Sequence, residues 1–229
     1  MNKLRKYIIY VVTCITLIAA CSKDGTHDEL DDIANDTPGH IPGMGGAGGE
    51  LTGTPFQFPS SIELAGGIKG DLFLVPMDDY CQQRGSGAFV LVQLNLVNKL
   101  GKDTLLVLPA GLTFLSDDIE DQNGILIQET KIELLKGQSC KTLVYTFCIN
   151  ELRHGSSRSS SYTFGPVTNA KPMVDLIKLV KDKGINYEDV GRDQLWEIKH
   201  ELQSAVWHIT DGSGLTADDK DFINQLANR

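Results

Sequence analysis

The chain has 229 residues, of which 41% are hydrophobic, 22% charged and 7% aromatic, and its formal net charge at pH 7 is -9. This composition is typical of a globular protein. The acidic balance argues against nucleic acid as a partner, because phosphate binding requires a clustered basic face, and against adhesion to anionic lipid by charge alone. After the ends are set aside, the chain can hold one domain of roughly 150–180 residues.

The first 20 residues have the pattern of a secretory signal peptide. Lys3, Arg5 and Lys6 form a basic start, and an apolar run follows over 7–18. This run is short for a transmembrane helix, which needs about 20 residues, but it suits a secretory signal. We therefore predict a signal peptide over 1–20, with an uncleaved anchor as the alternative.

The end of this segment indicates lipidation. The sequence Leu17-Ile18-Ala19-Ala20-Cys21 resembles the lipobox of bacterial lipoproteins. The resemblance implies cleavage before Cys21 and attachment of acyl chains, such as palmitate, to that cysteine. More than one acyl chain gives a stable membrane anchor. We expect a lipoprotein of the cell outer membrane, and the sequence leaves open whether it faces the periplasm or the cell surface.

Residues 21–55 are predicted to be a lipidated flexible tether. THDELDDIANDTPGH (26–40) is acidic and has no apolar period, and IPGMGGAGGELTGTP (41–55) is dominated by glycine and proline. Such segments bury too little apolar area to become ordered. A flexible linker of this length holds a domain roughly 30 Å from the membrane.

The stretch from 56 to 165 has the pattern of strands. In AFVLVQLNLVNKL (88–100), Val90, Val92 and Leu94 alternate with other residues, as in a half-buried strand. Several short runs of this kind, without intervening helices, favour an immunoglobulin-like antiparallel β-sandwich. The predicted strands are 56–66, 71–77, 88–100, 103–111, 124–135 and 141–150.

A polar segment, GSSRSSS (155–161), is predicted to be a mobile loop, and the period then changes to that of helices. Three helices are predicted over 169–184, 192–212 and 215–229, in a helical region (166–229) that packs on the sandwich. The middle helix is the clearest, because its apolar residues fall on a stripe about 100° wide. This stripe consists of Leu195, Ile198, Leu202, Ala205, Val206 and Ile209.

Three cysteines remain once Cys14 is removed with the signal and Cys21 carries lipid. Outside the cytoplasm thiols tend to be oxidised, and an odd number allows at most one internal disulfide. Cys140 and Cys148 lie towards opposite ends of one predicted strand, too far apart to pair with each other. Cys81 can pair with either, and we take Cys81 with Cys148 as the candidate disulfide.

Two short motifs suggest covalent chemistry. LQSAVW (202–207) and the tripeptide Phe147-Cys148-Ile149 resemble the apolar-Gln-x-Ala-apolar-Trp and aromatic-Cys-apolar motifs of bacterial surface thioester domains. In that family the cysteine attacks the glutamine carboxamide, ammonia leaves, and the internal thioester acylates an amine on a partner. The resemblance thus implies a reactive pair, Cys148 and Gln203. The alternative is that Gln203 hydrogen-bonds a neighbouring strand while Trp196 and Trp207 fill core positions.

Other chemistry finds no support in the sequence. His200 and His208 share a predicted helix, but no cysteine or acid stands at ligand spacing beside them. No nucleotide, dinucleotide or hydrolase fingerprint is present. We therefore expect no metal site, no cofactor and no enzymatic turnover.

The interpretation that follows is a non-catalytic binding or adhesion module, tethered to the outer membrane by lipid on Cys21. Its partner would be an unknown surface protein or glycan, and not nucleic acid. Two alternatives remain open. One is covalent attachment to partner amines through a thioester between Cys148 and Gln203, and the other is a structural subunit of an envelope complex.

Overall fold

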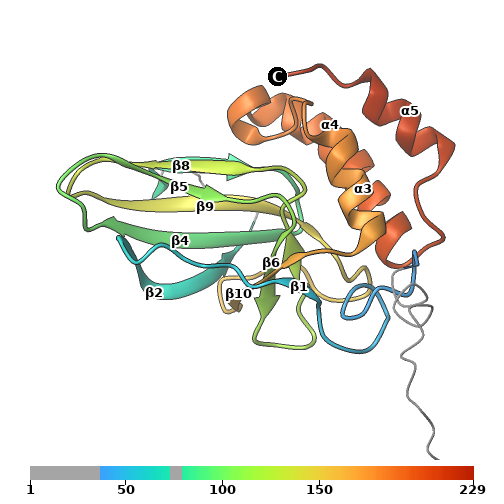
Figure 1. Ribbon diagram of the computed structural model, residues 1–229, viewed down its shortest axis with the longest axis horizontal. Helices are drawn as coiled ribbons and strands as arrows, with labels where there is room; N and C mark the ends of the chain where they lie inside the picture. The colour runs from blue at the N-terminus through green and yellow to red at the C-terminus, as the bar shows by residue number, and fades with distance from the viewer. Residues whose placement is uncertain (1–36, 73–78) are drawn as a thin grey trace, which may run out of the picture. The chain divides into compact units, whose positions relative to one another are not determined.

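The computed structural model describes residues 37–72 and 79–229 (Figure 1). The predicted signal peptide, the lipobox with Cys21 and the first part of the predicted tether lie outside these residues, as does most of the predicted strand 71–77. Within the described residues all strands precede all helices, as predicted. The strands are β1 (Gly53–Thr54), β2 (Ile62–Asp71), β3 (Gln82–Gly85), β4 (Val90–Asn98), β5 (Thr104–Leu108), β6 (Leu112–Ser116), β7 (Gly124–Ile125), β8 (Thr130–Leu134), β9 (Ser139–Cys148) and β10 (Ser161–Thr168). The helices are α3 (Lys171–Val180), α4 (Tyr187–Thr210) and α5 (Ala217–Gln225).

The main sheet closes on itself. Among the described residues, six antiparallel strands follow one another in the order β10-β2-β4-β9-β7-β6, and β10 also pairs with β6. Tyr162 of β10 lies beside Ile68 of β2 on one side and Ser116 of β6 on the other. The mostly β architecture is as predicted, but a closed sheet replaces the two separate facing sheets expected of an immunoglobulin-like sandwich. A register shift in β10 between Phe164 and Val167 accompanies this closure, since such irregularities bend a strand.

Alternation along β4 fills the interior of the closed sheet. Val90, Val92, Leu94 and Leu96 are fully buried, while the intervening Gln93 is only partly buried. The separate two-stranded ribbon β5-β8 packs over β4 and β9 and adds its own apolar side chains to this core. The pattern read from 88–100 is therefore confirmed.

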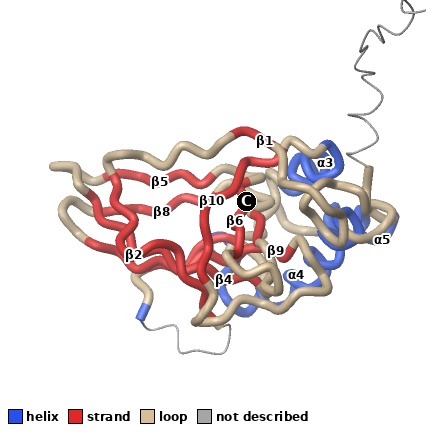
Figure 2. The backbone as a smooth tube through the Cα atoms, turned by 90° about the horizontal axis from the view of Figure 1, so that it is seen from below, coloured by secondary structure: helices blue, strands red, loops and turns tan. Residues whose placement is uncertain are grey.

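Strand β9 is buried on both faces, because helices cover the side that points away from the closed sheet. Val144 and Cys148 face the core of the closed sheet, whereas Tyr145 and Phe147 belong to the core shared with the helices. The three helices of the described chain gather at one end of the strands (Figure 2). The apolar stripe predicted on α4 is buried as expected.

The ends of the helices largely follow local chemistry. Pro172 stands in the first turn of α3. Helix α4 begins at Tyr187, earlier than predicted, and continues across a kink at Gly191. Thr216 and Asp219 form a capping box at the start of α5, in which each side chain accepts from the other's backbone N–H. Within residues 37–72 and 79–229, none of the helices has the length and apolarity needed to cross a membrane.

The last part of the predicted tether is packed, which corrects that prediction for residues 37–55. Ile41 and Met44 are buried in the core beneath the helices. The backbone N–H of Gly45 donates to the carbonyl of Ile149 at 2.6 Å. Gly45 has a φ of 57°, and a Cβ there would lie 2.2 Å from the Thr210 carbonyl oxygen. Glycine in this segment thus allows close approach of two backbones, whereas the sequence pattern suggested only flexibility.

Candidate functional site

The disulfide is formed by Cys81 and Cys140, with their Cα atoms 5.7 Å apart. The predicted pairing of Cys81 with Cys148 is therefore wrong. Strand β3 runs parallel to β9 with Gln82 beside Thr142, so Cys81 lies next to the start of β9. Of the cysteines in the described residues, Cys148 is the one outside a disulfide, and it is fully buried.

The side-chain amide of Gln203 lies against the backbone of Cys148. The Cys148 N–H donates to Oε1 of Gln203 at 2.9 Å, and Nε2 of Gln203 donates to the Cys148 carbonyl oxygen at 2.8 Å. Both residues are fully buried. The structure therefore brings together the two residues that the sequence motifs singled out, across 55 positions of the chain.

An aromatic wall closes one side of this contact. Trp207 lies one helical turn after Gln203 and stacks on Phe89, with the ring centres 5.4 Å apart. Both rings pack against the same apolar cluster as Cys148. Trp196 does not fill the core as expected, because 48% of it is exposed and it contacts His200 on the helix surface. Trp207 therefore borders the site, whereas Trp196 lies on the helix surface.

Burial determines the electrostatics of the thiol. It raises the pKa of Cys148 to about 12, although the Asn150 backbone N–H and the Trp207 indole act in the opposite direction. The Asn150 N–H lies 3.3 Å from Sγ of Cys148. Asn150 is itself fixed, because Nδ2 of its side chain donates to the Gly45 carbonyl and Oδ1 accepts from the Asn123 N–H. At neutral pH the thiol is therefore protonated, and its sulfur accepts a hydrogen bond from the Asn150 N–H.

Lys199 lies on α4 one turn before Gln203 and was not singled out by the sequence. It is buried, and its Nζ lies 2.8 Å from the centre of the Trp196 ring. Burial and the nearby Arg192 lower its pKa to about 8. A lysine placed among apolar residues on an amphipathic helix could have indicated this position, but the predicted stripe did not include it.

The two histidines of α4 have separate structural roles. His208 Nδ1 lies 2.8 Å from Oδ2 of Asp219, within the cap of α5. His200 packs on the rings of Phe89 and Trp196. No group of three or more potential metal ligands occurs in the part of the chain that the structure describes.

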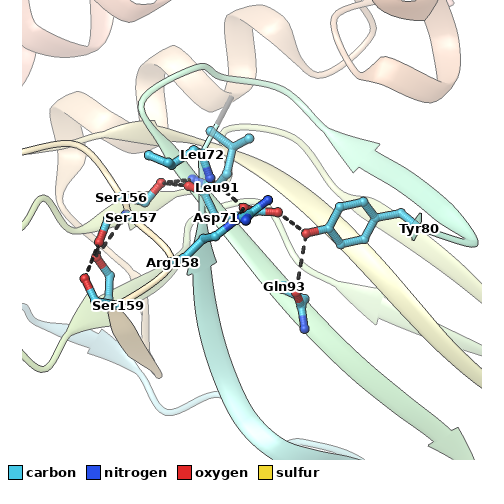
Figure 3. Close-up of polar contacts among 10 residues, drawn as sticks. Asp71, Leu72, Tyr80, Leu91, Gln93, Ser156, Ser157, Arg158 and Ser159 are labelled. Carbon is cyan, nitrogen blue, oxygen red and sulfur yellow. Dashed lines mark hydrogen bonds and ion pairs between the residues drawn. The ribbon is translucent and has the colours of Figure 1, made fainter. Parts of the chain in front are cut away.

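A second polar cluster was missed by the sequence reasoning altogether (Figure 3). Asp71 at the end of β2 accepts hydrogen bonds from Tyr80 Oη and, at 3.3 Å, from Nε of Arg158. Tyr80 Oη also lies 3.4 Å from Oε1 of Gln93. These residues come from β2, β4, the segment before β3 and the loop predicted to be mobile, so no local motif could have connected them. The loop 155–161, which was predicted to be mobile, is fixed to the rest of the fold, because Ser156 and Ser160 are buried and hydrogen-bonded.

Comparison of the chain with protein-family models, curated proteins and solved structures gave no match.

Proposed function

We propose that the protein is a lipid-anchored surface adhesion module that attaches to its partner covalently, through an internal thioester between Cys148 and Gln203. The observation that supports this proposal is the pair of hydrogen bonds that fixes the Gln203 carboxamide on the backbone of Cys148. A reaction between a thiol and an amide requires that the two groups be held in place before bond formation. Here β9 and α4 hold the carboxamide against the backbone of the residue that carries the thiol.

The chemical step is a transfer of the Gln203 acyl group from nitrogen to sulfur. Sγ of Cys148 forms a bond to Cδ of Gln203, the Cδ–Nε2 bond breaks, and the thiol proton leaves with the nitrogen as ammonia. No oxidant or reductant is needed. Negative charge develops on Oε1 during attack, and the Cys148 N–H already donates to this atom at 2.9 Å.

The surroundings suit a bond that water would otherwise hydrolyse. Cys148 and Gln203 have no exposed surface, and the stacked rings of Phe89 and Trp207 stand beside them. A primary amine on a partner would then open the thioester, form an amide with the Gln203 acyl group and release the Cys148 thiol. This reaction consumes the site, so the protein acts once and is not an enzyme.

The second candidate is a non-covalent binding module in which Gln203 only joins α4 to β9. It is favoured by the raised pKa of Cys148, because a protonated thiol is a weak nucleophile. It is also favoured by the fact that both polar atoms of the Gln203 amide are already satisfied. The third expectation, a structural subunit, gains less support. The exposed Leu105 and Val107 of β5 lie opposite the charged Glu133 and Lys131 of β8, which interrupts an apolar face.

Intact-mass measurement separates the first two candidates. We expect the full chain carrying Cys21→Ser, which cannot be acylated, to lack the mass of one ammonia in addition to the two hydrogens of the Cys81–Cys140 disulfide. Methylamine should add its own mass to this species. A deficit of two hydrogens alone, together with alkylation of Cys148 after unfolding, would overturn the thioester proposal and leave the non-covalent module.

Matched variants assign the mass change to the two residues. Cys148→Ala and Gln203→Ala should each abolish the loss of ammonia while retaining the loss of two hydrogens. The double variant Cys81→Ala with Cys140→Ala should do the reverse. Loss of ammonia that persists in Cys148→Ala would mean that it arises elsewhere in the chain.

A further inference from the structure

A polar pocket of about 370 Å³ lies on the outside of the closed sheet, away from the contact between Cys148 and Gln203. Asp71, Tyr80, Gln93, Lys141 and Arg158 contribute to its lining. This volume falls within the range of small-molecule sites in proteins. The described residues that line it are predominantly polar or charged, and Tyr80 adds an aromatic ring.

At the base of the pocket, the carboxylate of Asp71 already accepts hydrogen bonds from other groups of the protein. Asp71 is almost completely buried, and its side chain accepts from Tyr80 Oη, from Nε of Arg158 at 3.3 Å and from the Leu72 backbone N–H at 2.8 Å. Figure 3 shows Asp71 between Arg158 on one side and Tyr80 on the other. Asp71 therefore acts as an anchor that orients Tyr80 and Arg158, and it is not itself a free acceptor.

The loop that carries Arg158 is fixed at both ends. Oγ of Ser156 donates to the Asp71 carbonyl and accepts from the Leu91 N–H, both at 2.8 Å. Oγ of Ser160 donates to Asp121 at 2.6 Å. Arg158 is therefore presented from a loop that is tied to β2 and β4, and 64% of its side chain is exposed to solvent.

Apart from Asp71, the charged side chains that line the pocket are mainly cationic. Beyond Nε, the guanidinium of Arg158 makes no hydrogen bond to any residue that the structure describes. Nζ of Lys141 lies 4.8 Å from the centre of the Tyr80 ring, and Nζ of Lys69 donates to Ser161 Oγ. Asp79 adds a second carboxylate to the lining. The pocket thus has a local excess of positive charge on a chain whose net charge is -9.

We propose that this pocket binds an acidic sugar, with the sugar carboxylate between Arg158 and Lys141 and its hydroxyl groups against Asp79 and Gln93. The planar guanidinium of an arginine matches a carboxylate well, and a neighbouring ammonium strengthens the attraction. Sugar hydroxyls donate and accept, so they match the carboxylate of Asp79 and the amide of Gln93 in the same lining. A peptide carboxylate would use the same cations, so a glutamyl dipeptide serves as a control in the experiment that follows. The proposal does not depend on thioester formation.

Titration calorimetry on the full chain in detergent tests this proposal, with glucuronate as the probe. Glucose controls for the ring without the acid, and succinate and a glutamyl dipeptide control for the acid without the ring. We expect saturable binding of glucuronate and little or none of the three controls. The measurement is repeated with Cys148→Ala, and binding should be unchanged, so that failure of the thioester proposal is distinguishable from failure of this one.

Variants then locate the site. Arg158→Gln and Lys141→Gln should each weaken glucuronate binding at least about tenfold, since each removes a hydrogen bond to a charged group. Lys141 makes no ion pair in the described chain, so Lys141→Gln keeps the Asp71 anchor intact. Lys136→Gln, at an exposed turn, is the matched control and should bind as the unaltered chain does.

Three results would overturn the proposal. One is absence of glucuronate binding at millimolar concentration. Another is equal binding of glucose, or of succinate and the dipeptide, which would indicate a general polar or peptide carboxylate site. The third is glucuronate binding that survives both Arg158→Gln and Lys141→Gln, which would place the ligand elsewhere.

Discussion

The carboxamide of Gln203 is hydrogen-bonded through both of its polar atoms to the backbone of Cys148, so helix α4 is joined to strand β9 at a fully buried point. Because the contact uses the backbone of residue 148, it does not require the thiol. The structural role of Gln203 and the proposed chemical role of Cys148 can therefore be tested separately.

Relative to the chain with its carboxamide intact, Gln203→Ala should lower the free energy of unfolding by about 2–4 kcal/mol, because a buried N–H and a buried carbonyl of Cys148 lose their partner. Cys148→Ala keeps both hydrogen bonds and should cost no more than about 1–2 kcal/mol. Gln194→Ala, at an exposed position of the same helix, is the control and should change stability by less than about 0.5 kcal/mol. Urea denaturation measures all three, and a cost for Gln203→Ala no larger than that of the control would contradict the structural role.

Gly45→Ala should detach the segment 37–55 from the end of α4. A methyl group there would lie 2.2 Å from the Thr210 carbonyl oxygen, at a φ of 57° that alanine disfavours. We expect the free energy of unfolding to fall by about 1–3 kcal/mol and the backbone amides of this segment to exchange hydrogen faster. Gly46→Ala is the matched control, because nothing lies within 4 Å of a Cβ at that position. Equal effects of the two substitutions would argue against close packing of the segment.

Removal of the disulfide should destabilise the folded chain. The bridge joins residues separated by 59 positions, and closing a loop of this size contributes about 2–4 kcal/mol. The double variant Cys81→Ala with Cys140→Ala should therefore unfold at lower urea concentration than the unaltered chain. Addition of a reductant should reproduce the effect in the unaltered chain and should leave the double variant unchanged. A reductant effect on the double variant would point to another redox-sensitive group.

The sequence was most informative where structure depends on local periodicity. The alternation in β4, the stripe on α4 and the cap at Thr216 all follow from residues close together in the chain, and all are present. The two motifs around Cys148 and Gln203 also identified a real contact. One motif lies at the end of β9 and the other within α4, so each is local in the sequence, and the Gln203 carboxamide meets the backbone of Cys148 where the helix lies against the strand.

Pairings between residues far apart in the chain could not be predicted from local patterns in this way. Closure of the sheet depends on β10 meeting both β2 and β6, and the disulfide depends on β3 lying parallel to β9. Strand β3 consists of Gln82 to Gly85 and lacks the apolar alternation that would predict a strand. Glycines in 37–55 suggested flexibility, although close backbone contact favours the same residue type. The polar pocket was missed because its side chains come from separate segments of the chain.

The Asp71 carboxylate, which orients Tyr80 and Arg158 in the polar pocket, should make the free energy of unfolding depend on pH under acidic conditions. Burial acts to raise the pKa of Asp71, but hydrogen bonds from Tyr80, Leu72 and Arg158 outweigh it and hold the pKa below its usual value of 3.8. A carboxyl whose pKa is lower in the folded state contributes stability that is present above the unfolded pKa and is lost as the pH falls through the folded pKa. Unfolding of the chain should therefore become easier below about pH 4. Asp71→Asn should remove this part of the pH dependence, and Tyr80→Phe should reduce it, as measured by urea denaturation at a series of pH values. An acid limb that is identical in Asp71→Asn and in the unaltered chain would show that Asp71 is not held in its charged form by these neighbours.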